Sequence, residues 1–131
     1  MEIFGLDIVK TNPRLKNAVI YVNISFWVGI IADLLEAIEM MVFIFSEPSV
    51  SDLALIEPGF VLMVGWTVLM IWGVLKPIER KDILIITAFP VAFLFGIYNI
   101  FLGSPEAILN FIGTAIFSTG YFVSVKVSKQ L

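Results

Sequence analysis

IIADLLEAIEM, residues 30–40, sets three carboxylic acids into an otherwise apolar run. The acids are Asp33, Glu36 and Glu39. An ionisable side chain at the centre of a bilayer costs about 2.5–3.5 kcal/mol on insertion scales. This run lies in the first of several apolar stretches, and none of them contains a Lys, Arg or His to pair with the acids. Residues 30–40 therefore point to a helix in a membrane and to the first place to look for function.

The composition outside this run supports the same class. The chain has 131 residues, of which 60% are hydrophobic and 15% charged, and its mean hydropathy is +1.02. A soluble domain needs far more polar surface, so we expect an integral membrane protein with a single domain over residues 1–131. The chain has no Cys and no His, which excludes thiolate chemistry and the usual zinc ligands. A net charge of −3 gives no reason to expect a nucleic-acid partner.

Four stretches are long enough to cross a bilayer, which takes about 20 apolar residues in a helix. We expect residues 17–45, 58–75, 83–102 and 105–125 to form four transmembrane helices. The connections between them are short, which favours an all-α, antiparallel up-down bundle with consecutive helices adjacent.

Turn and cap residues mark the expected ends of these helices. Pro13 suits the start of the first helix, and Pro58 suits the first turn of the second. Gly103 suits the end of the third helix, and Ser104 is an N-cap candidate for the fourth. The segment before Asn12 has enough scattered apolar residues to lie on the membrane surface.

The charged residues outside the helices give the expected orientation. With four spans, every basic residue falls on the side of the termini and the middle loop: Lys10, Arg14, Lys16, Lys76, Arg80, Lys81, Lys126 and Lys129. The other two loops and their flanks carry only acids: Glu47, Asp52, Glu57 and Glu106. The positive-inside rule then predicts that the N and C termini are both cytoplasmic. We expect a multi-pass protein of a cell membrane, of the prokaryotic cytoplasmic type.

The three acids form a slanted line on one helix. At 100° per residue, neighbours in the series lie about 60° apart and about 4.5 Å apart along the axis. We expect Asp33 and Glu36 to form a deep pair and Glu39 to reach towards water. The acids can be protonated and bonded to other helices, paired with a basic partner chain, or placed at the interface by a different topology. They can also line a hydrated path for a cation, a common role of carboxyl groups in membranes.

A polar stripe on the fourth helix is the best counterpart for these acids. Glu106, Asn110, Thr114, Ser118 and Tyr121 recur at steps of three or four on an otherwise apolar segment. Such a stripe is expected to face the protein interior. The alternative is ordinary packing, in which Ser and Thr bond their own helix backbone.

Two further side chains are candidates for the same site. Asn99 places an amide in the third helix, and the indole of Trp66 beside a carboxylate would help to bind an organic cation. A Trp that only packs in the core or faces lipid is the alternative. Pro90 in the third helix removes one backbone N–H, which indicates either a bend or a kink that shapes a cavity.

These patterns favour a small membrane protein that binds or transports a cation, which can be a proton, a metal ion or an organic amine. A carboxylate cluster without a ligand motif predicts no specific metal site, and no cofactor is indicated. One alternative is an intramembrane enzyme that acts on a lipophilic substrate by carboxylate acid–base catalysis. Another is a non-catalytic accessory subunit of a larger complex. The expected partners are the lipid bilayer and either further copies of the chain or a larger membrane complex.

Overall fold

The computed structural model describes residues 3–46 and 48–131, and over these residues it contains helices and no strand. Glu47, one of the acids expected in the first loop, lies outside the described residues. In chain order the helices are α1 (Leu6–Thr11), the 3₁₀ helix η1 (Pro13–Leu15), α2 (Lys16–Phe45), α3 (Val50–Val74), α4 (Asp82–Ile86), the π-helix η2 (Thr87–Phe93), α5 (Leu94–Phe101) and α6 (Glu106–Ser128).

Three of these helical segments are long and apolar enough to cross a membrane. They are α3, the continuous helix formed by α4, η2 and α5, and α6. The acid-bearing helix α2 has 30 residues and is not among these three. Large apolar side chains cover the outside of the long helices, as in Val61, Leu62 and Val68 of α3. The chain is therefore a helical protein with the surface of a multi-pass membrane protein.

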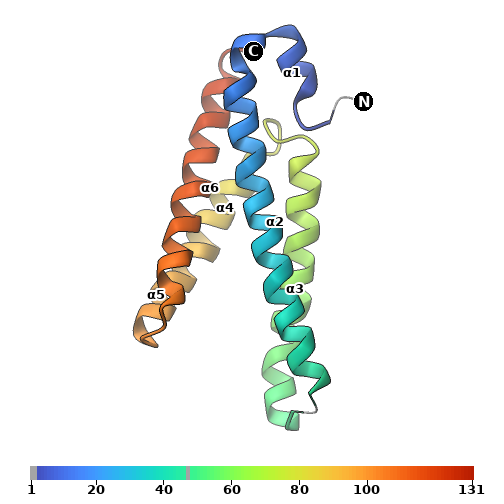
Figure 1. Cartoon of the computed structure of the whole chain (residues 1–131), viewed down its shortest axis with the longest axis vertical. Coiled ribbons are helices and arrows are strands. Elements are labelled where there is room, and N and C mark those ends of the chain that lie inside the picture. Colours follow the sequence, from blue (N-terminus) through green and yellow to red (C-terminus); the bar gives the residue numbers. More distant parts are fainter. Residues whose placement is uncertain (1–2, 47) are drawn as a thin grey trace.

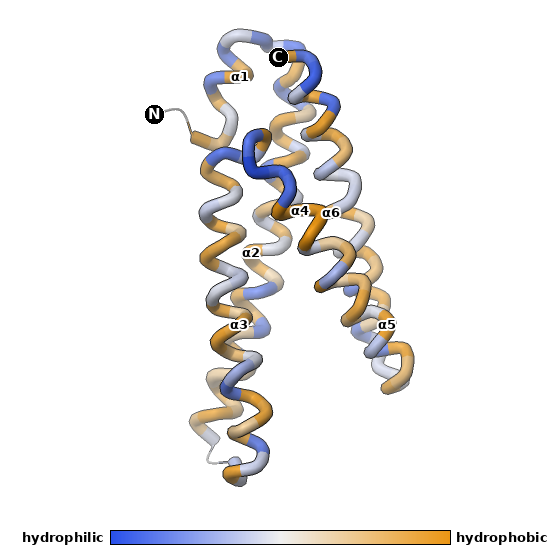
Figure 2. The backbone as a smooth tube through the Cα atoms, turned by 180° about the vertical axis from the view of Figure 1, so that it is seen from behind, coloured by the Kyte–Doolittle hydropathy of each residue, from blue (hydrophilic) through white to orange (hydrophobic). Residues whose placement is uncertain are grey.

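The long helices form two hairpins that meet at one end (Figure 1). α2 packs along α3, and the helix made of α4, η2 and α5 packs along α6. The N-terminal helix α1, the C terminus and the loop at 75–81 lie at the end where the hairpins meet (Figure 1). We call this the basic end, because it carries all eight Lys and Arg residues. Hydrophilic residues gather there, whereas hydrophobic residues dominate along the helices (Figure 2).

Small residues allow close helix contacts in the basic half, both between the two hairpins and inside the first one. Between the hairpins, a Cβ atom on Gly120 of α6 would lie 2.5 Å from Oγ of Ser25 in α2. Inside the α2–α3 hairpin, a Cβ on Gly29 would lie 2.2 Å from Cε of Met70, and one on Gly73 would lie 2.5 Å from the ring of Phe26. These approaches bring the helix backbones close together, as small residues do in membrane bundles. The main core cluster includes Val22, Phe26, Met70, Leu84 and Phe117.

The N-terminal segment closes the basic end of this core. The N–H of Phe4 donates to the carbonyl of Leu75 at 3.0 Å, and the amide of Asn23 donates to the carbonyl of Phe4 at 2.8 Å. Ile8 and Val9 of α1 pack against the core. The segment expected on the membrane surface is thus docked on the bundle.

The second helix begins earlier than the sequence predicts. The expected start at residue 58 is wrong, because α3 begins at Val50. Ser49 caps the helix by accepting a hydrogen bond from the N–H of Asp52 at 3.3 Å, which satisfies a donor that is otherwise free at a helix start. Pro58 consequently lies inside α3 and not in its first turn. The other three helices end within a few residues of the expected bounds.

The prediction that all consecutive helices lie side by side is also wrong in one place. α3 contacts the third long helix mainly at α4, near the loop that joins them. At the start of η2, the indole N–H of Trp66 in α3 also donates to the hydroxyl of Thr87 at 3.1 Å. Further from the basic end the two hairpins diverge (Figure 1).

Pro90 lies at the centre of the π-helix η2. Proline has no N–H for the i→i−4 ladder, and its ring crowds the preceding turn. A wider π turn is a known way for a helix to absorb such a break. From the sequence, Pro90 indicates either a simple bend or a kink that shapes a cavity. In the structure, Thr87, Val91 and Ala92 of η2 line a cavity between the hairpins.

Candidate functional site

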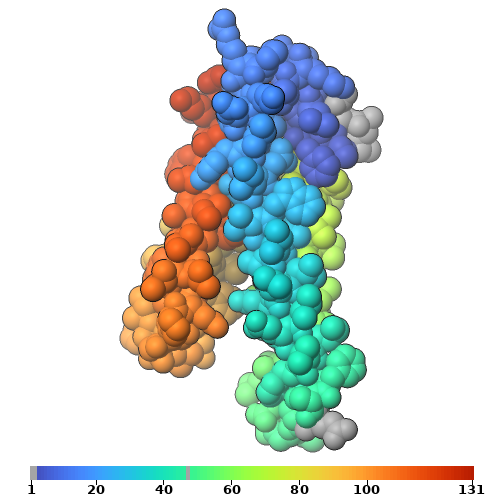
Figure 3. Space-filling model, viewed as in Figure 1, coloured from blue at the N-terminus to red at the C-terminus, as the bar shows by residue number. Residues whose placement is uncertain are grey.

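A cleft separates the two hairpins in the half of the molecule away from the basic end (Figure 3). It contains two adjoining spaces, which we call the deep cavity and the outer groove. The deep cavity has a volume of about 280 Å³, and the outer groove has about 500 Å³. They share five lining residues: Ala32, Glu36, Phe95, Leu109 and Asn110. The two spaces are thus parts of one continuous cleft.

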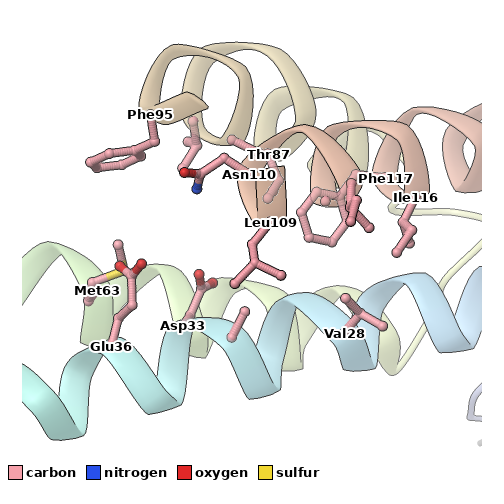
Figure 4. A pocket seen from close by; sticks show the side chains of 15 residues that line it. Val28, Asp33, Glu36, Met63, Thr87, Phe95, Leu109, Asn110, Ile116 and Phe117 are labelled. Atoms are coloured by element: carbon pink, nitrogen blue, oxygen red, sulfur yellow. The ribbon is translucent and has the colours of Figure 1, made fainter. Parts of the chain in front are cut away.

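The deep cavity is mostly apolar. Its 15 lining residues come from α2, α3, η2, α5 and α6, and only Asp33, Glu36, Thr87 and Asn110 among them carry polar side chains. In Figure 4 the carboxyl groups of Asp33 and Glu36 project from α2 towards Asn110 of α6. Apolar side chains such as Val28, Leu109 and Phe117 lie around them.

Asp33 has no partner within the described residues. Its Oδ2 atom is buried and forms no hydrogen bond. Among the described residues, Lys76 and Glu79 form an ion pair, and both lie in the loop at the basic end, away from Asp33. A buried carboxyl oxygen without a donor is costly, which makes Asp33 the first candidate for a functional group in this cleft.

The outer groove continues the line of acids towards the open end of the cleft. Glu36 and Glu39 of α2 line it on one side, and Glu106 of α6 lines it on the other. The groove also includes Asn99, whose amide donates to the side-chain oxygen of Asn110 at 2.7 Å. This hydrogen bond connects α5 to α6, and it occupies the side-chain oxygen of Asn110 as an acceptor.

The polar stripe of α6 divides between the cleft and the helix itself. Glu106 and Asn110 line the cleft. The hydroxyl of Thr114 donates to the carbonyl of Asn110 at 2.9 Å, and that of Ser118 donates to the carbonyl of Thr114 at 2.7 Å. These two side chains therefore satisfy their own backbone, which is the packing alternative that the sequence left open.

The remaining two candidates lie outside the cleft lining. Tyr121 packs against the core cluster, and its ring stacks edge-on against Phe122 with centroids 5.5 Å apart. Trp66 donates to Thr87, whose hydroxyl also donates to the carbonyl of Ile83 at 2.7 Å. The structure thus brings together Asp33, Glu36, Glu39, Asn99 and Asn110, and it places Thr114, Ser118, Tyr121 and Trp66 elsewhere.

Sequence reasoning missed the apolar walls. Phe95, Leu109, Phe117 and Met63 were indistinguishable from the many lipid-facing residues of their helices. Two signals were available. Gly113 lines the cavity and leaves room there, and Pro90 sets the wide helical turn from which Val91 and Ala92 reach it.

The lining of the cleft can attract a cation, but it lacks the set of ligands that a metal site needs. No group of three or more His, Cys, Asp or Glu that could hold a metal ion occurs among the described residues. The polar groups of the deep cavity are two carboxyl groups with a hydroxyl and an amide, and the cavity has no basic residue. A cation is the ligand that such a lining would stabilise.

Comparisons of the chain with protein-family models, with curated proteins and with solved structures found no match.

Proposed function

We propose that this protein binds a cation inside the membrane at Asp33 and Glu36 and carries it across the bilayer. One observation carries the proposal: Oδ2 of Asp33 is buried beside the deep cavity and forms no hydrogen bond within the described residues. Intramembrane acids without a partner commonly mark ion pathways. The outer acids Glu39 and Glu106 would raise the local concentration of cations at the mouth of the cleft.

In this proposal α2 crosses the membrane together with the three apolar helical segments, which makes four transmembrane helices. The 30 residues of α2 exceed the length needed to cross a bilayer. The end that carries all the Lys and Arg residues would be cytoplasmic, as the positive-inside rule predicts. The cleft would then open towards the opposite side of the cell membrane.

The test is cation flux into liposomes that contain the full chain. A pH-sensitive dye and an ion-sensitive dye inside the vesicles would report protons and metal ions, and radiolabelled amines would report organic cations. We expect Asp33→Asn and Glu36→Gln each to reduce the flux by at least about tenfold, because they remove the charge that stabilises the bound cation. Glu57→Gln is the matched control, since Glu57 is exposed on α3 and lines neither space of the cleft. Equal flux in wild-type and Asp33→Asn vesicles would refute the proposal.

A further inference from the structure

The shape and lining of the cleft narrow the class of cation, on the assumption that the proposed function holds. We propose that the site takes an organic cation, an ammonium group on an apolar body, and that this ligand enters through the outer groove.

The walls of the deep cavity favour a ligand with apolar surface. All but four of its 15 lining residues are apolar or glycine. The aromatic rings of Phe95 and Phe117 are among them. A volume of about 280 Å³ is close to the lower end of small-molecule pockets, which begin at about 300 Å³. A proton alone needs no such space, and a hydrated metal ion gains nothing from apolar walls.

The polar groups in the cavity are too few for a hard metal ion. Ca²⁺ takes about six to eight oxygen ligands, and Mg²⁺ needs a near-ideal octahedron. The hydroxyl of Thr87 already bonds Ile83 and Trp66, and the oxygen of Asn110 accepts from Asn99. The carboxyl groups of Asp33 and Glu36 remain. One ionised carboxylate neutralises one ammonium group, and the second carboxyl group can keep its proton. The surrounding apolar side chains would then contact the apolar body of the ligand.

The outer groove provides the route of entry. It shares Glu36 and Phe95 with the deep cavity, so an ammonium group can stay beside a carboxylate while its apolar body stays beside an aromatic ring. Glu39 and Glu106 stand further along the groove, where they would attract the ligand first. Ala32 lines both spaces, so its small side chain leaves the junction between them open.

The experiment measures binding of tetraalkylammonium ions to the full chain in nanodiscs. Tetramethyl-, tetraethyl- and tetrapropylammonium would be compared with Mg²⁺ by equilibrium dialysis, with empty nanodiscs subtracted to remove lipid partitioning. We expect affinity to rise by at least about tenfold from the tetramethyl to the tetrapropyl ion, because each buried methylene contributes about fourfold. Asp33→Asn should abolish binding of the whole series.

A pair of Ala→Phe variants tests the route and the cavity. Ala32→Phe would fill the junction, and we expect it to weaken tetrapropylammonium binding by at least about tenfold. Ala115→Phe is the matched control, because Ala115 is exposed on α6 and lines neither space. It should leave the affinity unchanged and so separate a blocked cavity from a general effect of added bulk.

The outcomes separate this inference from the proposed function. Binding of Mg²⁺ or proton flux that depends on Asp33, together with no chain-length dependence among the ammonium ions, would overturn the organic-cation inference and leave the proposed function intact. Equal affinities in Ala32→Phe and Ala115→Phe would overturn the proposed route. If neither cation binding nor cation flux depended on Asp33, both the inference and the function on which it rests would be overturned.

Discussion

At the residue scale, the molecule keeps a carboxyl group where it costs stability. Oδ2 of Asp33 is buried without a hydrogen bond, and the basic residues are all at the other end of the bundle. A buried polar group without a partner destabilises a protein by about 1–3 kcal/mol. Binding sites often carry such a cost, because the group is completed only by its ligand.

The first prediction follows from this cost. Asp33→Asn removes the charge that is hardest to place in an apolar cleft, so we expect the free energy of unfolding to rise by about 0.5–2 kcal/mol while cation binding is lost. The measurement is denaturant-induced unfolding of the purified protein in detergent micelles without added cation.

Asp52→Asn is the control with the opposite expected sign. Asp52 accepts a hydrogen bond from the Ser49 hydroxyl at 2.6 Å in the first turn of α3. An acid at a helix N-terminus stabilises by about 0.3–1 kcal/mol, so its loss should lower the free energy of unfolding. A fall of similar size in Asp33→Asn would contradict the prediction.

The second prediction concerns the closest contact between the hairpins. A Cβ on Gly120 would lie 2.7 Å from Cβ of Ser25, which is held by its own helix and cannot turn aside. Gly120→Ala should therefore push α6 from α2 and lower the free energy of unfolding by about 1–3 kcal/mol. Ser25 also donates to the carbonyl of Ile116 on α6 at 3.4 Å, and this bond would be lost.

Gly65→Ala provides the matched control for this contact. Nothing lies within 4 Å of a Cβ placed on Gly65 in α3. Alanine is favoured over glycine in a helix by about 0.5–1 kcal/mol, so this variant should be neutral or more stable. Both variants can be compared by thermal unfolding in the same detergent, and an equal melting temperature for the two would count against the close contact.

Side-chain direction marks the limit of sequence reasoning at this scale. The acids stand out in an apolar run, so their place at a site could be predicted. The spacing of Thr114 and Ser118 could not show whether their hydroxyls bond the helix backbone or face the cleft, because both choices satisfy a hydroxyl in a membrane. The apolar lining could not be predicted either, since lipid and cavity favour the same side chains.

At the scale of the element, the π-helix η2 connects a single proline to the shape of the cleft. Its wider turn sets the direction of Val91 and Ala92 relative to Thr87, and all three line the deep cavity. π-turns inside α-helices occur frequently at functional sites.

The third prediction is that Pro90→Ala alters the cavity more than the fold. Without the proline, η2 can return to regular α-helix, which removes a cost of about 3 kcal/mol in a helix interior. We expect unchanged or greater stability in detergent and a cation affinity reduced by at least about tenfold, because the lining side chains turn away from their present positions.

Pro58→Ala separates this effect from the general effect of removing a proline. Pro58 lies inside α3, and neither space of the cleft includes it. It should change stability but not affinity. Full cation binding by Pro90→Ala would show that the π-helix does not shape the site.

Helix ends could be predicted where local chemistry decides them. Gly103 adopts a φ of +66° just beyond α5, as expected of a residue that ends a helix. The start of α3 was misplaced because Pro58 suggested a first turn, whereas the cap formed by Ser49 and Asp52 starts the helix earlier. A proline inside a helix is rare enough that sequence patterns favour the wrong boundary.

At the scale of the whole molecule, the cleft results from an uneven distribution of packing residues. In the basic half, large side chains from both hairpins, such as Met70 and Phe117, share one core, and the hairpins approach closely where Gly120 faces Ser25. In the other half, the facing residues include Ala32, Asp33 and Gly113, which are too small or too polar to hold the hairpins together. Helix lengths and short loops cannot reveal this difference, so the sequence predicted the helices and missed their divergence.

The last prediction tests whether α2 crosses the membrane together with the other long helices. The chain has no Cys, so single cysteines can be introduced at Thr11 and Lys129 near the basic end and at Ser51 and Leu102 near the other end, where all four residues are exposed. In intact cells, a membrane-impermeant maleimide should label Ser51→Cys and Leu102→Cys, whereas Thr11→Cys and Lys129→Cys should react only after permeabilisation. If α2 did not cross, Thr11→Cys would be labelled together with Ser51→Cys, since α3 alone would then separate that side from the basic loop. The acids of α2 would in that case lie outside the bilayer, and the cost that makes them informative would disappear.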